Sequence, residues 1–113
     1  MAQVQSVCID PGHGGDDPGA QANNLTEATL NLQVAFIVRT KLEALGYPVY
    51  MTRTTDTTLS HAQRAEYCNA HHASILVAIH QNDYTYGNAD YSTALYYKPQ
   101  DQEIGRASCR ERV

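Results

Sequence analysis

Short apolar runs alternate with amphipathic stretches along this chain. Residues 4–9 and 47–53 form two such runs, each typical of a strand. The run at residues 74–79 is continuously apolar, which predicts a strand buried on both faces. Residues 93–98 predict a fourth strand, at or near an edge of the sheet.

A helix is expected between the first two strands. From residue 26 to residue 45 apolar positions recur at helical spacing and predict one buried stripe, made of Leu30, Val34, Ile37, Val38, Leu42 and Leu45. Gly46 stands where the glycine after a helix belongs. Asn24 with Glu27 three residues later is typical of an N-terminal capping box.

A second helix is expected before the third strand. Ser60 with Gln63 predicts another capping box, opening a helix that runs to about Ala70. The order strand, helix, strand, helix, strand indicates an α/β domain. We therefore expect a largely parallel twisted sheet flanked by helices, of the three-layer type, with right-handed crossovers.

Residues capable of metal chemistry follow the strands. Ligands of such sheets bind beyond the carboxyl ends of the strands, and His13 and His80 follow the first and third strands. Glu27, in the first helical turn after a Gly-rich loop, points towards the same rim. Two imidazoles and one carboxylate form a common catalytic zinc set with a fourth position open to water. Gly14 and Gly15 let the backbone stay close to a metal and its substrate.

Each candidate ligand also has a simpler interpretation. Glu27 can be the capping partner of Asn24, and His80 can be a hydrogen-bonded histidine at a strand end. The two histidines at residues 71–72 are most simply explained by their place near a helix C-terminus, where the helix dipole favours histidine. His61, near a helix start, is expected to be exposed.

Length and composition narrow the class of protein. The 113 residues suit one small domain. Eight Lys and Arg against 12 Asp and Glu give a net charge of −4, which argues against nucleic acid as a partner. No apolar run approaches the roughly 20 residues of a membrane-spanning helix, and residues 1–5 carry no secretory signal. We expect a monomer.

The cysteines suggest packing rather than cross-linking. The three, at positions 8, 68 and 109, are too few and too scattered for a disulfide framework or a zinc ribbon. Cys8 lies in an apolar strand and Cys68 on a helix, so both are expected to be packing residues and not nucleophiles.

The last ten residues break with the rest of the chain. Residues 104–113 have neither strand alternation nor helical periodicity. Their sequence, Ile-Gly-Arg-Ala-Ser-Cys-Arg-Glu-Arg-Val, is what a common short-read sequencing adapter encodes when translated in frame. We therefore predict that residues 104–113 are a non-native tail.

Four motifs follow one another along residues 4–98. They are Ile-Asp-Pro-Gly-His-Gly-Gly-Asp-Asp-Pro-Gly-Ala at residues 9–20, Glu27 with Leu32, the stretch from Thr52, Arg53 and Asp56 through Arg64 and Asn69, and Val-Ala-Ile-His-Gln-Asn at residues 77–82. In this order they resemble the zinc-dependent N-acetylmuramoyl-L-alanine amidases of the amidase_3 type. The last motif has Ala78 where the family has Ser.

The resemblance implies a site and a reaction. His13, Glu27 and His80 would be the ligands of Zn²⁺, and Asn82 would contact substrate. The substrate would be peptidoglycan, cleaved at the amide that joins the lactyl group of N-acetylmuramic acid to L-alanine by metal-assisted hydrolysis. The site of action would be the cell wall, extracellular or periplasmic, as for an autolysin or an endolysin.

One expected residue is missing. The family carries its general acid/base glutamate on a late strand, beyond the equivalent of Lys98, and nothing in this chain matches it. Glu103 stands in the wrong context and Glu111 belongs to the tail. Loss of a general base costs on the order of 10²–10⁴-fold in rate. We therefore expect residues 1–103 to be the N-terminal portion of an amidase catalytic domain, truncated at the C-terminus and impaired in catalysis.

Two other functions stay open at this point. One is a non-catalytic cell-wall binding module or pseudoenzyme with the same fold. The other is a different zinc hydrolase, such as a peptidase, on a related α/β scaffold.

Overall fold

Three parallel strands form the main sheet of the computed structural model, which describes residues 4–81, 95–97 and 110–112. Their order is β4 (Val49–Met51), β1 (Val7–Pro11), β5 (Ile75–Ile79), with β1 in the middle. The chain therefore crosses the sheet from β4 on one side of β1 to β5 on the other.

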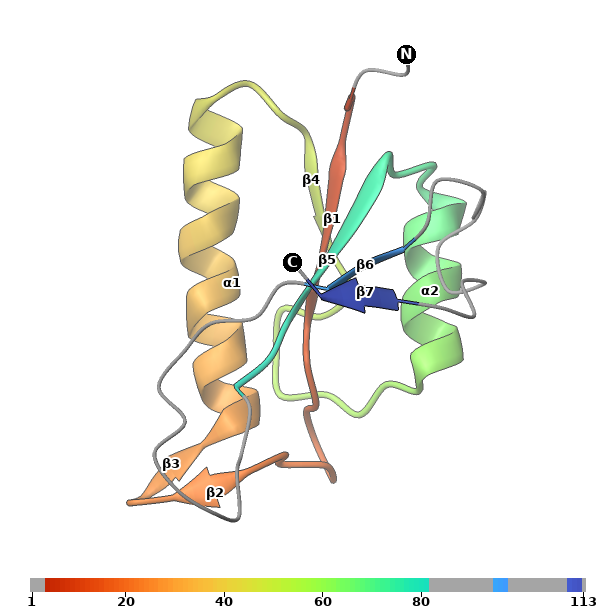
Figure 1. Ribbon diagram of the computed structural model, residues 1–113. Helices are drawn as coiled ribbons and strands as arrows, with labels where there is room; N and C mark the ends of the chain where they lie inside the picture. The colour runs from red at the N-terminus through yellow and green to blue at the C-terminus, as the bar shows by residue number, and fades with distance from the viewer. Residues whose placement is uncertain (1–3, 82–94, 98–109, 113) are drawn as a thin grey trace.

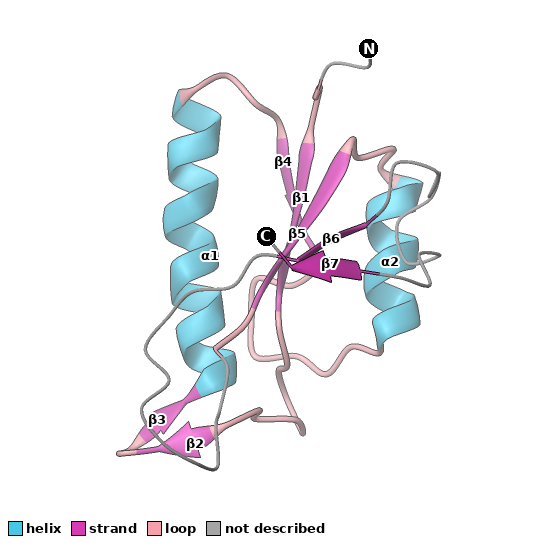
Figure 2. Ribbon diagram, viewed as in Figure 1, coloured by secondary structure: helices cyan, strands magenta, loops and turns pink. Residues whose placement is uncertain are grey.

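Two helices connect these strands. Helix α1 (Glu27–Ala44) leads from β1 to β4, and α2 (His61–Ala70) leads from β4 to β5. The two crossovers run in opposite directions across the sheet, so right-handed connections place the helices on opposite faces. Figures 1 and 2 show the sheet between α1 and α2. The predicted α/β fold with a largely parallel, helix-flanked sheet is confirmed.

Strand β1 is buried at every position because it has a strand on each side and a helix on each face. Its side chains alternate between the two faces. Val7 and Ile9 pack in the hydrophobic core with Met51 and with α1. The residues between them, Cys8 and Asp10, bond to α2.

A disulfide joins β1 to α2, which contradicts the prediction of two packing cysteines. Cys8 is bonded to Cys68, with their Cα atoms 5.7 Å apart, and both residues are fully buried. The two cysteines lie 60 positions apart in the sequence, and no local pattern indicated that they pair. The pairing follows from the topology, because α2 returns across the face of β1 that Cys8 occupies.

The buried face of α1 is rotated from the predicted stripe. The helix buries Ala28, Asn31 and Ala35, with Leu32, Phe36, Val38 and Leu42 packed against the core. Val34, Ile37 and Leu45 are exposed at 37%, 56% and 73%. The small side chains of Ala28 and Ala35 let the helix backbone approach the sheet, which the apolar pattern alone did not indicate.

Strand β5 is not buried on both faces as predicted. Ile75 and Val77 are exposed at 41% and 37%. Among the described strands, β5 has a hydrogen-bonded neighbour on one side only, which is β1. The strand that is buried on both faces is β1.

The ends of the helices are capped in two ways. At the end of α1, Gly46 donates to the Glu43 carbonyl and Tyr47 to the Leu42 carbonyl, a Schellman motif with the predicted glycine at φ +93°. The capping box of Ser60 and Gln63 at the start of α2 is confirmed.

The predicted capping box of Asn24 and Glu27 is wrong. The N-cap of α1 is Thr26, whose side chain makes no capping bond. Asn24 instead forms the turn, with Asn23, of a hairpin between β2 (Gln21–Ala22) and β3 (Leu25–Thr26). Both asparagines have positive φ, as a tight hairpin turn requires.

The fourth predicted strand forms outside the parallel sheet. Strand β6 (Leu95–Tyr97) pairs antiparallel with β7 (Arg110–Arg112) in a separate two-stranded sheet. A strand within residues 104–113 was not expected from their pattern. That residues 104–113 are a non-native tail stays a prediction.

Candidate metal centre

Three side chains from three segments converge at the carboxyl end of the sheet. His13 Nε2 lies 3.2 Å from Glu27 Oε1, and His80 Nδ1 lies 3.2 Å from the same oxygen. One ligand atom from each residue lies within 4.8 Å of those of the other two. The structure thus brings together all three residues that the sequence singled out.

Strand pairing explains why the two histidines meet. Pro11 lies opposite Ile79 in the register of β1 with β5, and the Gly12 N–H donates to the Ile79 carbonyl at 2.9 Å. The residues that follow each strand therefore leave the sheet side by side. The rings of His13 and His80 meet edge to face, with centroids 5.1 Å apart.

The Glu27 carboxylate is buried and fully hydrogen-bonded. Oε2 accepts from the Ala20 N–H at 2.9 Å, and Oε1 accepts from the Gln81 N–H at 3.0 Å and from Asn31 Nδ2 at 3.4 Å. Burial raises the pKa of Glu27, but these donors together with His13 outweigh it, and the net pKa lies below its ordinary value. Glu27 is thus held as a carboxylate facing both imidazoles.

His13 is held from its other nitrogen. Its Nδ1 lies 2.8 Å from Asp17 Oδ2, and Asp17 Oδ1 accepts from the Gly19 N–H at 3.2 Å. The bond with His13 and the Gly19 N–H lower the pKa of Asp17. In the sequence, Asp17 is a member of the motif at residues 9–20 and has no role assigned to it. Its spacing of four residues from His13 was the available signal.

The glycines that touch the site differ from the predicted pair. A Cβ on Gly12 would lie 2.6 Å from His80 Nδ1, and a Cβ on Gly19 would lie 2.6 Å from Glu27 Oε2. Gly14 and Gly15 instead face the loop at residues 53–58 and adopt positive φ. Close approach to the ligands therefore depends on Gly12 and Gly19.

Two buried arginines hold the loop that carries His13. Arg53 donates to the Pro11 and Gly12 carbonyls, at 3.0 and 2.9 Å. Arg64 donates to the His13 carbonyl at 2.9 Å and pairs with Asp10 at 2.8 Å. Burial lowers the pKa of Arg53. Both arginines belong to the third motif, but no role could be assigned to them from the sequence.

The remaining candidate residues divide into two groups. His61 is exposed, and His71 Nδ1 bonds to the Tyr67 carbonyl at 2.8 Å, as expected for histidines at helix ends. Asn82 and Glu103 lie outside the described residues.

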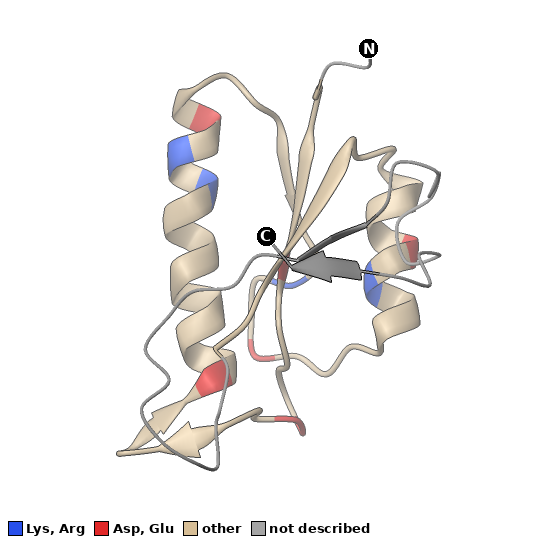
Figure 3. Cartoon of the chain, in the orientation of Figure 1, with Lys and Arg blue, Asp and Glu red and all other residues tan. Residues whose placement is uncertain are grey.

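The donor set fits a small divalent cation. Zinc binds imidazole and carboxylate at about 2.0–2.2 Å in tetrahedral geometry, which separates neighbouring ligand atoms by about 3.3 Å. Both contacts with Glu27 Oε1 are 3.2 Å. Acidic residues also gather at this end of the described chain, around the start of α1 and the loop after β1 (Figure 3). The local charge therefore favours a cation.

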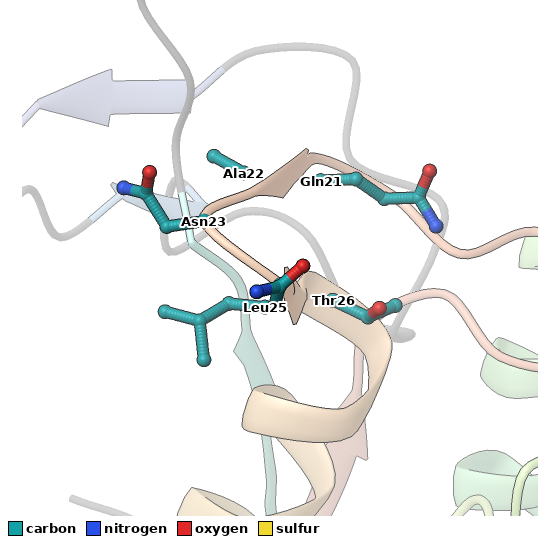
Figure 4. A pocket seen from close by; sticks show the side chains of 6 residues that line it. Gln21, Ala22, Asn23, Leu25 and Thr26 are labelled. Carbon is teal, nitrogen blue, oxygen red and sulfur yellow. The ribbon is translucent and has the colours of Figure 1, made fainter.

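A separate surface hollow lies on the β2–β3 hairpin. Figure 4 shows its lining side chains, and the residues are Gln21, Ala22, Asn23, Asn24, Leu25 and Thr26. None of the three converging residues lines it.

Among the described residues, no helix is long and apolar enough to span a membrane.

A protein-family model matches this chain over most of its length. The model, Amidase_3, is described as N-acetylmuramoyl-L-alanine amidase and matches residues 7–111. The match includes all four sequence motifs.

Curated relatives agree with the family model. The chain is 38% identical to N-acetylmuramoyl-L-alanine amidase CwlM of Bacillus licheniformis, over 87% of this chain and 43% of the relative. It is 36% identical to the sporulation-specific N-acetylmuramoyl-L-alanine amidase of Bacillus subtilis, over 89% of this chain and 44% of the relative. The chain thus spans less than half of either relative.

Solved structures share the fold. An N-acetylmuramoyl-L-alanine amidase from Clostridium difficile 630 matches with a TM-score of 0.77 and 36% identity, over 88% of this chain and 55% of that one. The catalytic domain of CwlV from Bacillus (Paenibacillus) polymyxa var. colistinus matches with a TM-score of 0.74 and 33% identity, over 85% of this chain and 55% of that one.

Proposed function

Because the chain belongs to the Amidase_3 family of N-acetylmuramoyl-L-alanine amidases, we propose that His13, Glu27 and His80 hold the zinc ion of a peptidoglycan amidase. The observation that carries the proposal is the convergence of both imidazoles on one oxygen of a buried carboxylate. A divalent cation would bind all three donor atoms at once, whereas without it a ring N–H can donate to the carboxylate, as His80 Nδ1 does at 3.2 Å.

The site is accessible to a substrate. The His80 and His13 side chains are exposed at 40% and 26%, whereas Glu27 is exposed at 5%. When bound, zinc polarises an amide carbonyl and lowers the pKa of a coordinated water. The protein's part is to fix the three ligands, with Glu27 oriented by Asn31 and by the N–H groups of Ala20 and Gln81.

The proposed substrate bond is the amide between the lactyl group of N-acetylmuramic acid and L-alanine. Its hydrolysis adds water across the C–N bond, leaving a carboxylate on the lactyl group and a free α-amine on L-alanine. Asn82 stays a proposed substrate contact.

The general acid/base stays a separate prediction. Glu103 lies outside the described residues, and Glu111 lies in β7, where only the backbone is described. We expect the 113-residue chain to hydrolyse peptidoglycan at a rate on the order of 10²–10⁴-fold below that of a family member with its general base.

Metal analysis tests the ligand assignment. The purified chain should bind one equivalent of zinc, and His13→Ala and His80→Ala should each abolish stoichiometric binding. His61→Ala is the matched control, because this exposed histidine lies at the start of α2, and it should bind zinc as the parent does. Unchanged zinc content in either ligand variant would contradict the assignment.

Hydrolysis is tested separately on purified peptidoglycan. Free α-amino groups of L-alanine should appear slowly, stop with a chelator and return with zinc. Release of these amino groups at the rate of a family member with its general base would refute the prediction that this chain lacks one. Binding to peptidoglycan without any release would favour the wall-binding module or pseudoenzyme instead.

The proposed site of action is the cell wall. The buried disulfide between Cys8 and Cys68 supports a location outside the reducing cytosol, where such bonds persist. The expectation of a monomer stays a prediction, and light scattering coupled to size-exclusion chromatography would test it.

A further inference from the structure

His13 is contacted by a carboxylate on each side of its ring. Glu27 Oε1 lies 3.2 Å from Nε2, and Asp17 Oδ2 lies 2.8 Å from Nδ1. Asp17 is exposed at 62%, while Glu27 is almost fully buried. The two carboxylates therefore have different surroundings and different roles towards the same imidazole.

Asp17 is held in place although it is exposed. Its own backbone forms a two-way bridge with Gly14, with N···O distances of 2.7 and 3.1 Å. Its second carboxylate oxygen accepts from the Gly19 N–H. Backbone and side chain are thus both fixed, so Oδ2 is presented to His13 by a closed turn.

We propose that Asp17 is a positioning residue that fixes the proton of His13 on Nδ1 and leaves the Nε2 lone pair for the metal. An ionised carboxylate only accepts hydrogen bonds, and Nδ1 lies nearer to Asp17, at 2.8 Å, than Nε2 lies to Glu27, at 3.2 Å. The single proton of the neutral ring is therefore favoured on Nδ1, where the hydrogen bond is shorter. Partners of this kind orient metal-binding histidines and raise the basicity of the ligand.

The second histidine is held differently. His80 presents Nδ1 to Glu27, and its ring lies against Gly12, where no side chain could fit. His80 therefore has Glu27 as a hydrogen-bond partner, and among the described residues no second carboxylate contacts its ring, as Asp17 contacts that of His13. Only the His13 side of the site should respond to the loss of a carboxylate at position 17.

The neighbouring Asp16 offers a matched control. It is an exposed carboxylate in the same turn, and its backbone N–H donates to Thr58 Oγ1 at 2.8 Å. Replacing its side chain removes the same charge from the same loop and leaves that backbone bond in place.

The test compares Asp17→Ala, Asp17→Asn and Asp16→Ala in the full chain. Zinc affinity is measured by competition with a chromophoric chelator, and Asp17→Ala should lose about 10–100-fold. Asp17→Asn keeps an acceptor oxygen without the charge and should lose less. Asp16→Ala should stay within about twofold of the parent, and all metal-free variants should unfold at nearly the same temperature.

A second measurement needs no metal. Long-range ¹H–¹⁵N NMR spectra of the metal-free chain, at a pH high enough to leave imidazole neutral, report which nitrogen of His13 is protonated. The parent should show Nδ1–H, and Asp17→Ala should show a mixture of tautomers.

These readouts separate the role of Asp17 from the metal site proposed above, on which it rests. A parent chain that binds no zinc but shows the Nδ1–H tautomer overturns the zinc site and supports the hydrogen bond. An Nε2–H tautomer in the parent, or equal affinity losses in Asp17→Ala and Asp16→Ala, overturns the role of Asp17. Unfolding of metal-free Asp17→Asn would also overturn it, because the residue would then be structural.

Discussion

Glu27 combines a buried position with a negative charge, which is costly unless donors surround it. Four residues stabilise the buried charge of Glu27. The N–H groups of Ala20 and Gln81 and the amide of Asn31 donate to its two oxygens, and His13 lies beside it. The same donors that keep Glu27 ionised also fix the direction in which it faces the histidines.

The lowered pKa of Glu27 predicts an acid-sensitive fold. Because the folded-state pKa lies below the unfolded one, ionised Glu27 stabilises the fold above its ordinary pKa of 4.5. This stability is lost as the pH falls through the lower folded value. Chemical denaturation of the metal-free chain should show less dependence of the unfolding free energy on pH below 4.5 in Glu27→Gln than in the parent.

Glu43 provides the comparison for this experiment. It lies on the same helix, is 55% exposed and pairs with Arg39 at 3.6 Å. Glu43→Gln should keep the parent's dependence on pH. Equal pH dependence in the parent and Glu27→Gln would contradict the stabilising role of the buried carboxylate.

Gly12 predicts a steric effect on the site. A methyl group at this position would lie 2.6 Å from His80 Nδ1, so the ring would have to move. Gly12→Ala should therefore weaken zinc binding about 10–100-fold, as for other losses of ligand orientation. Chelator competition measures the change.

Gly46 serves as the control, because a side chain there would strain the backbone without contacting another residue. It has φ +93° and nothing within 4 Å of an added Cβ. Gly46→Ala should cost about 1 kcal/mol of stability through backbone strain, without changing zinc affinity. Unchanged affinity in Gly12→Ala would show that His80 can bind from another ring position.

At the residue scale, the convergence of side chains could be predicted where the strand order alone placed them. His13 and His80 follow parallel strands, and Glu27 opens the next helix, so topology and family resemblance both pointed to them. Asp17 and Asn31 were not assigned roles, because their contacts depend on the conformation of the loop after β1. That conformation is set by hydrogen bonds between segments distant in sequence.

At the scale of elements, β1 connects the core to the site. One face packs against α1, and the other is bonded to α2 through Cys8 and Asp10. Arg64, one helical turn before Cys68, reaches from α2 to the loop of His13. The disulfide and the buried ion pair therefore hold α2 in the position from which it supports that loop.

The disulfide predicts a large contribution to stability. Closing a loop of 60 residues removes unfolded-state entropy worth about 4 kcal/mol. The Cys8→Ala/Cys68→Ala variant should lose roughly 2–5 kcal/mol in urea denaturation. Cys109→Ala is the control and should match the parent. Equal stability of all three proteins would contradict a structural role for this bond.

The elements themselves were predictable to within a few residues, but their burial was not. Apolar periodicity marked α1 and β5 correctly, yet Ile37 and Val77 are exposed. A pattern of apolar residues does not show which face has a partner. The hairpin of β2 and β3 was missed because its strands have two residues each, and Asn23-Asn24 was the only signal for its turn.

At the scale of the whole molecule, the candidate site joins three separate parts of the fold. A metal bound by His13, Glu27 and His80 would connect the end of β1, the start of α1 and the end of β5. A ligand that binds only the folded state stabilises it by mass action. The metal is therefore expected to act as a cross-link between these elements.

Zinc should raise the thermal stability of the chain. At about 100 times its dissociation constant, the gain is about 2.7 kcal/mol, which corresponds to a rise of roughly 10 °C or more for a domain of this size. Differential scanning calorimetry should show the rise, its reversal by a chelator and its absence in His80→Ala. An unchanged Tm in the presence of stoichiometric bound zinc would mean that the unfolded chain binds it equally well.

The parallel pairing of β5 with β1 also determines when the site can form. Glu27 follows His13 by 14 residues, but His80 arrives only after another 53, through a crossover that includes β4 and α2. Pairings between distant segments form slowly, because chain entropy must be lost before any contact stabilises them. A refolding chain therefore acquires its third ligand late, and the appearance of tight metal binding reports the closing of the sheet.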